Sequence, residues 1–285
     1  MVRALLGGTL VAVICGVVGT WVVIRGMAFL GEAIGHGMLP GVALATVLGA
    51  PVLLGGAVSA VVMSAAIGSM QRSGRLSYDT AIGLLFVGML SLGVIIVSHS
   101  DSFATDATAL LFGEILALRD GDVLLLAAAL GVVVAVAATF HRSFVVAAFD
   151  ARIAHTLGLR PAAAQVALVG LVTVAVVASY QAVGTLLVVG LLLGPVVAAN
   201  RWTRRIPMTM VLASALGAVS VLVGLLVSWY AATAAGASIA CTAILLAACS
   251  ALLRGLVDTV RERSVVSRDL LVGRSADAHP QRGTP

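Results

Sequence analysis

The sequence predicts an all-α integral membrane protein, a polytopic bundle of eight or nine transmembrane helices. Hydrophobic residues make up 61% of its 285 residues and charged residues only 10%, and the mean hydropathy is +1.14. A soluble domain needs more polar surface than this to cover its core. Apolar runs of about 20 residues, the length at which a helix crosses the hydrocarbon core, also recur from end to end.

Nine apolar runs define the expected elements in chain order: 4–24, 27–49, 51–70, 79–98, 122–140, 162–180, 182–200, 206–229 and 237–254. No small-residue cleavage site follows the first run, so we interpret it as a span and not as a signal peptide. The stretch 162–200 is too long for one helix, and Ser179, Tyr180 and Gln181 mark its expected break. The number falls to eight if one run is re-entrant or broken. We expect residues 1–254 to form the transmembrane domain and residues 255–285 a disordered polar tail.

The arginines indicate topology and not a nucleic-acid partner. The net charge is +5, but fifteen of the seventeen basic residues fall in alternate connections and in the tail, with Arg3 and Arg119 as the exceptions. This bias orients bacterial membrane proteins with their basic connections in the cytoplasm. The sequence therefore predicts a multi-pass protein of the cytoplasmic membrane, with its N-terminus outside and its tail inside.

Glu32 and His36 are the candidate metal ligands. They stand four residues apart inside the apolar run 27–49, so a helix places both side chains on one face. Ionisable groups are costly within a membrane span and by default indicate function. Carboxylate and imidazole suit a divalent transition metal, although an internal pair without a ligand is the alternative. Pro40, just beyond them, is expected either to free a carbonyl or simply to kink the helix.

The connections carry less specific signals. Segment 99–121 is expected outside and is acidic, and a solvated loop is favoured there over a cation-attracting vestibule. Asp79 is expected to cap the helix that starts near it. Segment 141–161 is expected inside, where Phe149–Leu159 can form a short helix with Asp150 as its N-cap and Gly158 near its end. The three cysteines form no CxxC or Cys/His cluster, which favours simple packing.

Five segments in order resemble the permease subunit of metal-cation ABC importers, the zinc/manganese family. They are GEAIGHGMLPGVA at 31–43, DTAIG at 79–83, LFGEIL at 111–116, the FD…LGL segment at 149–159 and QAVGTLLV at 181–188. Three positions depart from the family pattern. Glu32 stands where the family usually has Asp, which changes ligand reach, and Gly35 stands where it usually has Ser. Glu114 replaces a usual Asn, either as an added charge that attracts metal or as a solvated residue.

The resemblance implies a transmembrane pathway for manganese or zinc, with ferrous iron as a further candidate, and Glu32 and His36 as metal ligands. The cation is cargo, and no permanently bound cofactor is expected. The implied partners are a cytoplasmic ATPase, an extracytoplasmic metal-binding protein, a second copy of the chain and membrane lipid. The ATPase would contact the coupling segment through Phe149, Asp150, Leu157, Gly158 and Leu159. A second Glu32–His36 pair, backbone carbonyls, other spans or waters would complete the metal shell.

The chain is not expected to be an enzyme itself. It has no GxxxxGK[ST] phosphate loop, no HExxH and no GxSxG. ATP hydrolysis is therefore expected in a separate subunit. The alternative is a proton-coupled secondary carrier in which Glu32 exchanges a proton for the cation.

Overall fold

The computed structural model describes residues 1–72, 77–98, 113, 115–149 and 161–276. Within them it contains helices and no strand, which confirms the predicted all-α class. Its elements are α1 (Val2–Ile24), α2 (Phe29–Gly37), α3 (Leu39–Leu48), α4 (Val52–Arg72), α5 (Tyr78–Val97), the 3-10 turn η1 (Ile115–Ala117), α7 (Asp120–Phe149), α9 (Pro161–Asn200), α10 (Ile206–Ala231) and α11 (Ala235–Ala276).

Eight helical stretches in the described ranges are long and apolar enough to cross a membrane, counting the two halves of α9 separately. The apolar run 27–49 is not among them, because it is broken into α2 and α3, of nine and ten residues. The break falls at Met38, just before Pro40, whose ring cannot donate an N–H to the carbonyl four residues back. Of the two predicted counts, eight long spans is therefore the correct one.

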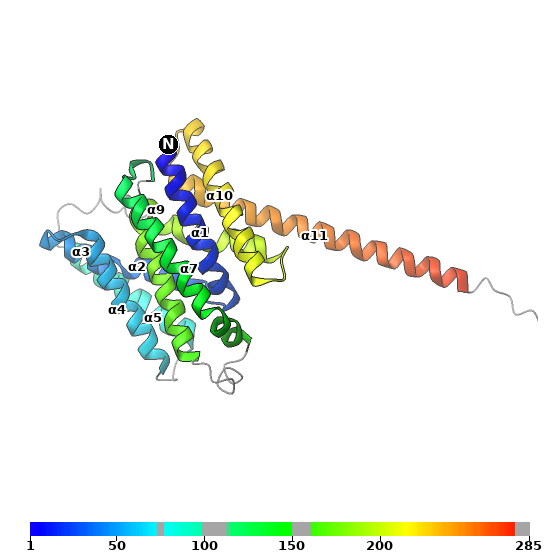
Figure 1. Cartoon of the computed structure of the whole chain (residues 1–285), viewed down its shortest axis with the longest axis horizontal. Helices are drawn as coiled ribbons and strands as arrows, with labels where there is room; N and C mark the ends of the chain where they lie inside the picture. Colours follow the sequence, from blue (N-terminus) through cyan, green and yellow to red (C-terminus); the bar gives the residue numbers. More distant parts are fainter. Residues whose placement is uncertain (73–76, 99–112, 114, 150–160, 277–285) are drawn as a thin grey trace, which may run out of the picture.

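The broken segment still runs from one end of the bundle to the other (Figure 1). At its start, Gln165 in the first turns of α9 donates to the sulfur of Met27, at 3.5 Å. At its end, α3 packs antiparallel to the start of α4. There Gly41 and Gly55 approach so closely that a Cβ on either would collide with the other's carbonyl. Two half-length helices thus replace one spanning helix, and the break lies in the interior of the bundle.

The described arginines are distributed between the two ends of the bundle as the sequence predicts. Trp21, near the end of α1, packs edge-on against His141 of α7 at 5.4 Å between ring centroids, so these helix ends lie together beside Arg25 and Arg142. The α9–α10 turn with Arg201, Arg204 and Arg205 lies at the same end, because α10 packs antiparallel to α1. The exception Arg3 lies at the opposite end, 2.8 Å from Asp120. The chain is accordingly a multi-pass protein of the cytoplasmic membrane.

The helix α9 is two helices joined at Gly184, whose dihedrals (φ 72°, ψ 168°) are not helical. The predicted division of the stretch 162–200 is confirmed. The break lies at Gly184, three residues beyond the predicted positions 179–181. Glycine tolerates this conformation because it has no Cβ. The backbone of Gly113 packs directly against Val183 and Gly184, which leaves no room for a side chain on Gly113. The second half of α9 then runs parallel to α1.

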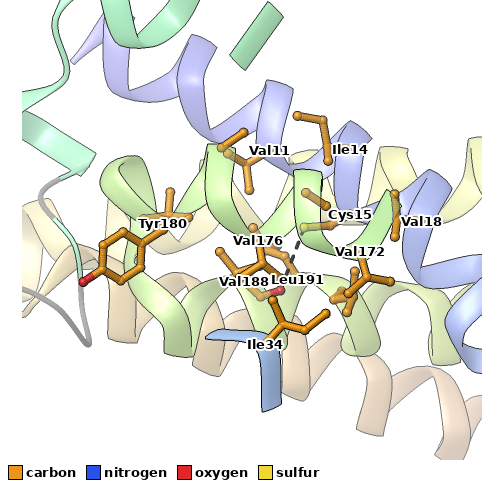
Figure 2. Close-up of a cluster of buried hydrophobic side chains, with 14 of the residues drawn as sticks. Val11, Ile14, Cys15, Val18, Ile34, Val172, Val176, Tyr180, Val188 and Leu191 are labelled. Carbon is orange, nitrogen blue, oxygen red and sulfur yellow. Dashed lines mark hydrogen bonds between the residues drawn. The ribbon is translucent and has the colours of Figure 1, made fainter. Parts of the chain in front are cut away.

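The core forms where α1 meets both halves of α9 (Figure 2). Its side chains are apolar and almost fully buried, and the thiol of Cys15 donates to the carbonyl of Val188 at 3.9 Å. Ile34 of α2 packs into the same cluster. This packing anchors the face of α2 that carries Ile34. The orientation of the other face of α2 is fixed as a consequence.

The end of α11 differs from the expected pattern, since the helix continues to Ala276, past the predicted boundary at residue 254 (Figure 1). The first part of the expected tail is therefore helical, and the division at residue 254 remains a prediction. Along α5 and α10, large Leu and Val side chains are exposed, including Leu84, Val87, Val211 and Leu222. Such surfaces suit contact with lipid.

Candidate cation-binding site

Glu32 and His36 lie on one face of α2 and line the same cavity, of about 340 Å³. Both side chains are half-buried, as their positions on a packed internal helix require. The opposite walls come from the second half of α9 and the first turns of α11. The remaining lining residues are Thr185, Leu186, Val189, Gly190, Leu193, Gly194, Ala240 and Ile244. The predicted pair therefore faces an otherwise apolar cavity within the bundle.

A backbone hydrogen bond selects the tautomer of His36. Its Nδ1 lies 3.1 Å from the carbonyl oxygen of Glu32, one helical turn earlier. A carbonyl oxygen can only accept, so Nδ1 must carry the proton in this bond. The lone pair then resides on Nε2, which is the arrangement of a metal-binding imidazole whose other nitrogen is held in place. The edge contact with Phe86, at 5.5 Å between ring centroids, further restricts the ring.

The carboxylate of Glu32 has no cationic partner in the described part of the chain, where the one salt bridge joins Arg3 and Asp120. An ionised carboxylate in an apolar cavity requires a compensating positive charge. The electrostatics of the cavity thus suit a positively charged ligand.

The described residues of one chain supply too few strong donors for a closed metal site. Among the described residues, no group of three His, Cys, Asp or Glu side chains comes together. Transition metals in proteins take four or more ligands. Glu32 and His36 alone are too few to complete a coordination shell, so a metal bound there would also need weaker donors, water or another chain.

Thr185 is a lining residue that the sequence analysis does not single out as a site residue. Its side chain is 5% exposed, and its Oγ1 has no hydrogen-bond partner. The signal in the sequence was a threonine directly after a glycine inside a long apolar run. That pattern indicates a site only once the break at Gly184 is known.

Several other predicted positions fall outside the described residues: Glu114, Asp150, Leu157, Gly158 and Leu159, together with most of the acidic segment 99–121. Of the coupling segment, only the backbone of Phe149 is described, as the last residue of α7. The prediction that Asp79 caps α5 is wrong. Ser77 is the N-cap, and its Oγ accepts from the amide of Thr80 at 3.2 Å. A capping residue must lie just before the first turn, so that its side chain can accept from an amide within that turn. Asp79 lies in that first turn.

Comparisons with known proteins agree with this arrangement. The profile of the ABC 3 transport family matches residues 1–254. The manganese transport system membrane protein MntC of Listeria monocytogenes is 34% identical over 244 residues, which cover 86% of this chain and 87% of MntC. A probable iron transport system membrane protein of Haemophilus influenzae is 29% identical over 239 residues, or 84% of this chain and 88% of that protein.

A solved structure, PsaBC from Streptococcus pneumoniae in complex with Fab, contains a chain of the same fold. The TM-score is 0.76 at 31% sequence identity, and the match covers 87% of this chain and 89% of that one. The chain therefore belongs to the ABC 3 transport family, and it is a membrane permease subunit of an ABC transporter.

Proposed function

We propose that this permease imports a divalent transition-metal cation, which binds Glu32 and His36 on its way through the membrane. The observation that carries the proposal is the unpaired Glu32 carboxylate beside the Nε2 lone pair of His36, in a cavity inside the membrane domain. Nitrogen and oxygen donors of this kind suit manganese, ferrous iron and zinc. The relatives named for manganese and iron transport support the same class of cargo.

Manganese is the first ion to test, with zinc and ferrous iron as competitors. The cation is cargo in this proposal and not a resident cofactor. A pathway must hold its ion strongly enough to select it and weakly enough to release it. A shell that keeps some exchangeable positions satisfies that requirement better than a closed tetrahedral site.

ATP hydrolysis is assigned to a separate cytoplasmic ATPase, because the chain has no phosphate-binding loop of its own. An extracytoplasmic metal-binding protein would deliver the cation to the outer end of the bundle. A second copy of the permease would supply a second Glu32–His36 pair across a two-fold axis. These partners would complete the site that the described residues of one chain leave open, and they would supply the energy for transport.

The test is uptake of radioactive manganese into proteoliposomes that hold the permease with its ATPase. We expect uptake to require ATP on the ATPase side. Competing divalent transition metals are expected to reduce manganese uptake. Vesicles holding the permease alone, with an imposed proton gradient, provide the comparison. Uptake by the permease alone, driven by that gradient, would contradict an ABC mechanism and would identify a secondary carrier.

A further inference from the structure

Thr185 differs from the other described threonines that lie within helices, because its hydroxyl has no protein partner. Seven of the others donate their hydroxyl to the carbonyl four residues earlier, which satisfies a hydroxyl inside an apolar helix: Thr9, Thr20, Thr46, Thr139, Thr173, Thr209 and Thr242. Thr80, in the first turn of α5, instead shares a hydrogen bond with the hydroxyl of Ser77. The Oγ1 of Thr185 makes no such bond and is buried.

The break in α9 explains the difference. Gly184, with φ 72° and ψ 168°, precedes Thr185 directly and interrupts the helix between Thr185 and the residue four positions earlier. The carbonyl that would normally accept the hydroxyl proton is therefore displaced. A buried hydroxyl without a partner costs free energy, so such a group in a native structure calls for a ligand or a function.

The position of Thr185 relates it to the Glu32–His36 pair. All three residues line the same cavity. Thr185 also packs against Gly35, which precedes His36 on α2. A Cβ placed on Gly35 would lie 3.4 Å from Cγ2 of Thr185 and 3.5 Å from its Cβ. The threonine thus contacts the short length of helix that carries both candidate ligands.

We propose that the Thr185 hydroxyl oxygen is a third protein donor to the transported cation, alongside the Glu32 carboxylate and His36 Nε2. This inference rests on the proposed function and names a residue that tunes its site. A neutral hydroxyl adds coordination without adding charge, so it assists binding while still allowing release. An oxygen donor also suits harder ions such as Mn²⁺ better than soft ones.

The helix dipole does not oppose this arrangement strongly. Thr185 begins the second half of α9, whose N-terminal end carries about half a positive charge. The full negative charge of the Glu32 carboxylate faces the same cavity and outweighs it. The cavity as a whole therefore remains favourable to a cation.

Equilibrium binding of Mn²⁺ to the purified permease–ATPase complex tests the proposal. Thr185→Val replaces the hydroxyl with a methyl group and is expected to weaken binding by at least about tenfold. Thr185→Ser retains the hydroxyl and is expected to stay within about threefold of the wild type. Gly35→Ala adds a methyl group against the same side chain without changing any donor. It serves as the packing control and should bind like the wild type.

The outcomes separate this inference from the proposed function. If Thr185→Val binds Mn²⁺ like the wild type while Glu32→Gln does not bind, the third donor is wrong and the metal pathway stands. If neither substitution changes binding, the metal site and the third donor are both overturned.

A change of donor type provides a readout that a purely structural role would not affect. Thr185→Cys places a sulfur where the hydroxyl was, and a soft sulfur favours Cd²⁺ over Mn²⁺. We expect the ratio of Cd²⁺ affinity to Mn²⁺ affinity to rise in this variant relative to Thr185→Ser. An unchanged ratio, including equal losses for both ions, would show that the side chain at 185 does not contact the cation.

Discussion

At the scale of single residues, one hydrogen bond decides how His36 can act. Because Nδ1 donates to the carbonyl of Glu32, the free lone pair lies on Nε2. The partner carboxylate is held on the same helical face and has no cationic neighbour among the described residues. A cation is then the ligand that satisfies both groups at once. A proton competes for the same lone pair, so acid conditions are expected to weaken binding.

Replacing His36 with Ala is expected to reduce metal uptake by more than about 100-fold, since loss of a direct ligand should cost at least as much as loss of a residue that supports one. Uptake into cells or proteoliposomes measures the effect, with membrane expression checked in parallel. Ile244→Val changes the same cavity without removing a donor and should transport normally. Normal uptake by the His36→Ala variant would remove this histidine from the pathway.

The sequence was sufficient to predict that Glu32 and His36 share one helical face in an apolar setting, because i, i+4 spacing and local hydropathy are properties of the sequence itself. It was not sufficient to locate Thr185, whose significance depends on two features of the tertiary structure. The break at Gly184 removes its usual acceptor, and the packing of α9 on α2 brings it to the cavity. A single threonine in an apolar run carries neither signal by itself.

At the scale of elements, two broken helices build the cavity. The break between α2 and α3 ends α2 just beyond His36, and the break in α9 begins a new helix at Thr185. The sequence predicted the division of α9 within a few residues, because 162–200 exceeds the length of one span. It predicted 27–49 as one run, since hydropathy does not register a break between two apolar half-helices.

Gly184→Ala is expected to lower the stability of the protein by about 1–3 kcal/mol, because the Gly184 dihedrals strain any residue with a Cβ. Thermal unfolding of the purified complex would show this as a lower apparent Tm. Gly170→Ala is the matched control, since the added methyl group on the same helix meets no atom within 4 Å. An equal or higher apparent Tm for Gly184→Ala would contradict the described break.

The proposed coupling segment around Phe149–Leu159 leads to a second prediction at this scale. Leu157→Asp places a charge where an apolar contact with the ATPase is expected, and so should uncouple ATP hydrolysis from transport. Co-purification of the ATPase and ATP-driven uptake, measured on the same preparation, test this. If both survive the substitution, another part of the chain couples to the ATPase.

At the scale of the whole molecule, the described part of each chain carries one Glu32–His36 pair, which is too few donors to hold a metal alone. The described basic residues of the connections gather at one end of the bundle, except Arg119, which lies at the other end beside Asp120 and its partner Arg3. Composition and arginine spacing were sufficient for this orientation, because the positive-inside bias acts on sequence-local charges. The number of chains in the working unit depends on which apolar surfaces contact another chain and which contact lipid. A single sequence does not distinguish these two kinds of surface.

The working unit is expected to contain two copies of the permease and two ATPase subunits. A two-fold axis would double the Glu32–His36 pair and the coupling segment together. Native mass spectrometry of the detergent-solubilised complex should show this stoichiometry. A transport-competent assembly with one permease chain would exclude the symmetric unit.

The most direct test of the metal pathway is an anomalous difference map, recorded at the manganese edge from crystals of the complex soaked in Mn²⁺. The account predicts a peak within ligand distance of the Glu32 carboxylate and of His36 Nε2, and the loss of that peak in crystals of the Glu32→Gln variant. A strong peak elsewhere in the transmembrane bundle, with none beside Glu32 and His36, would contradict it.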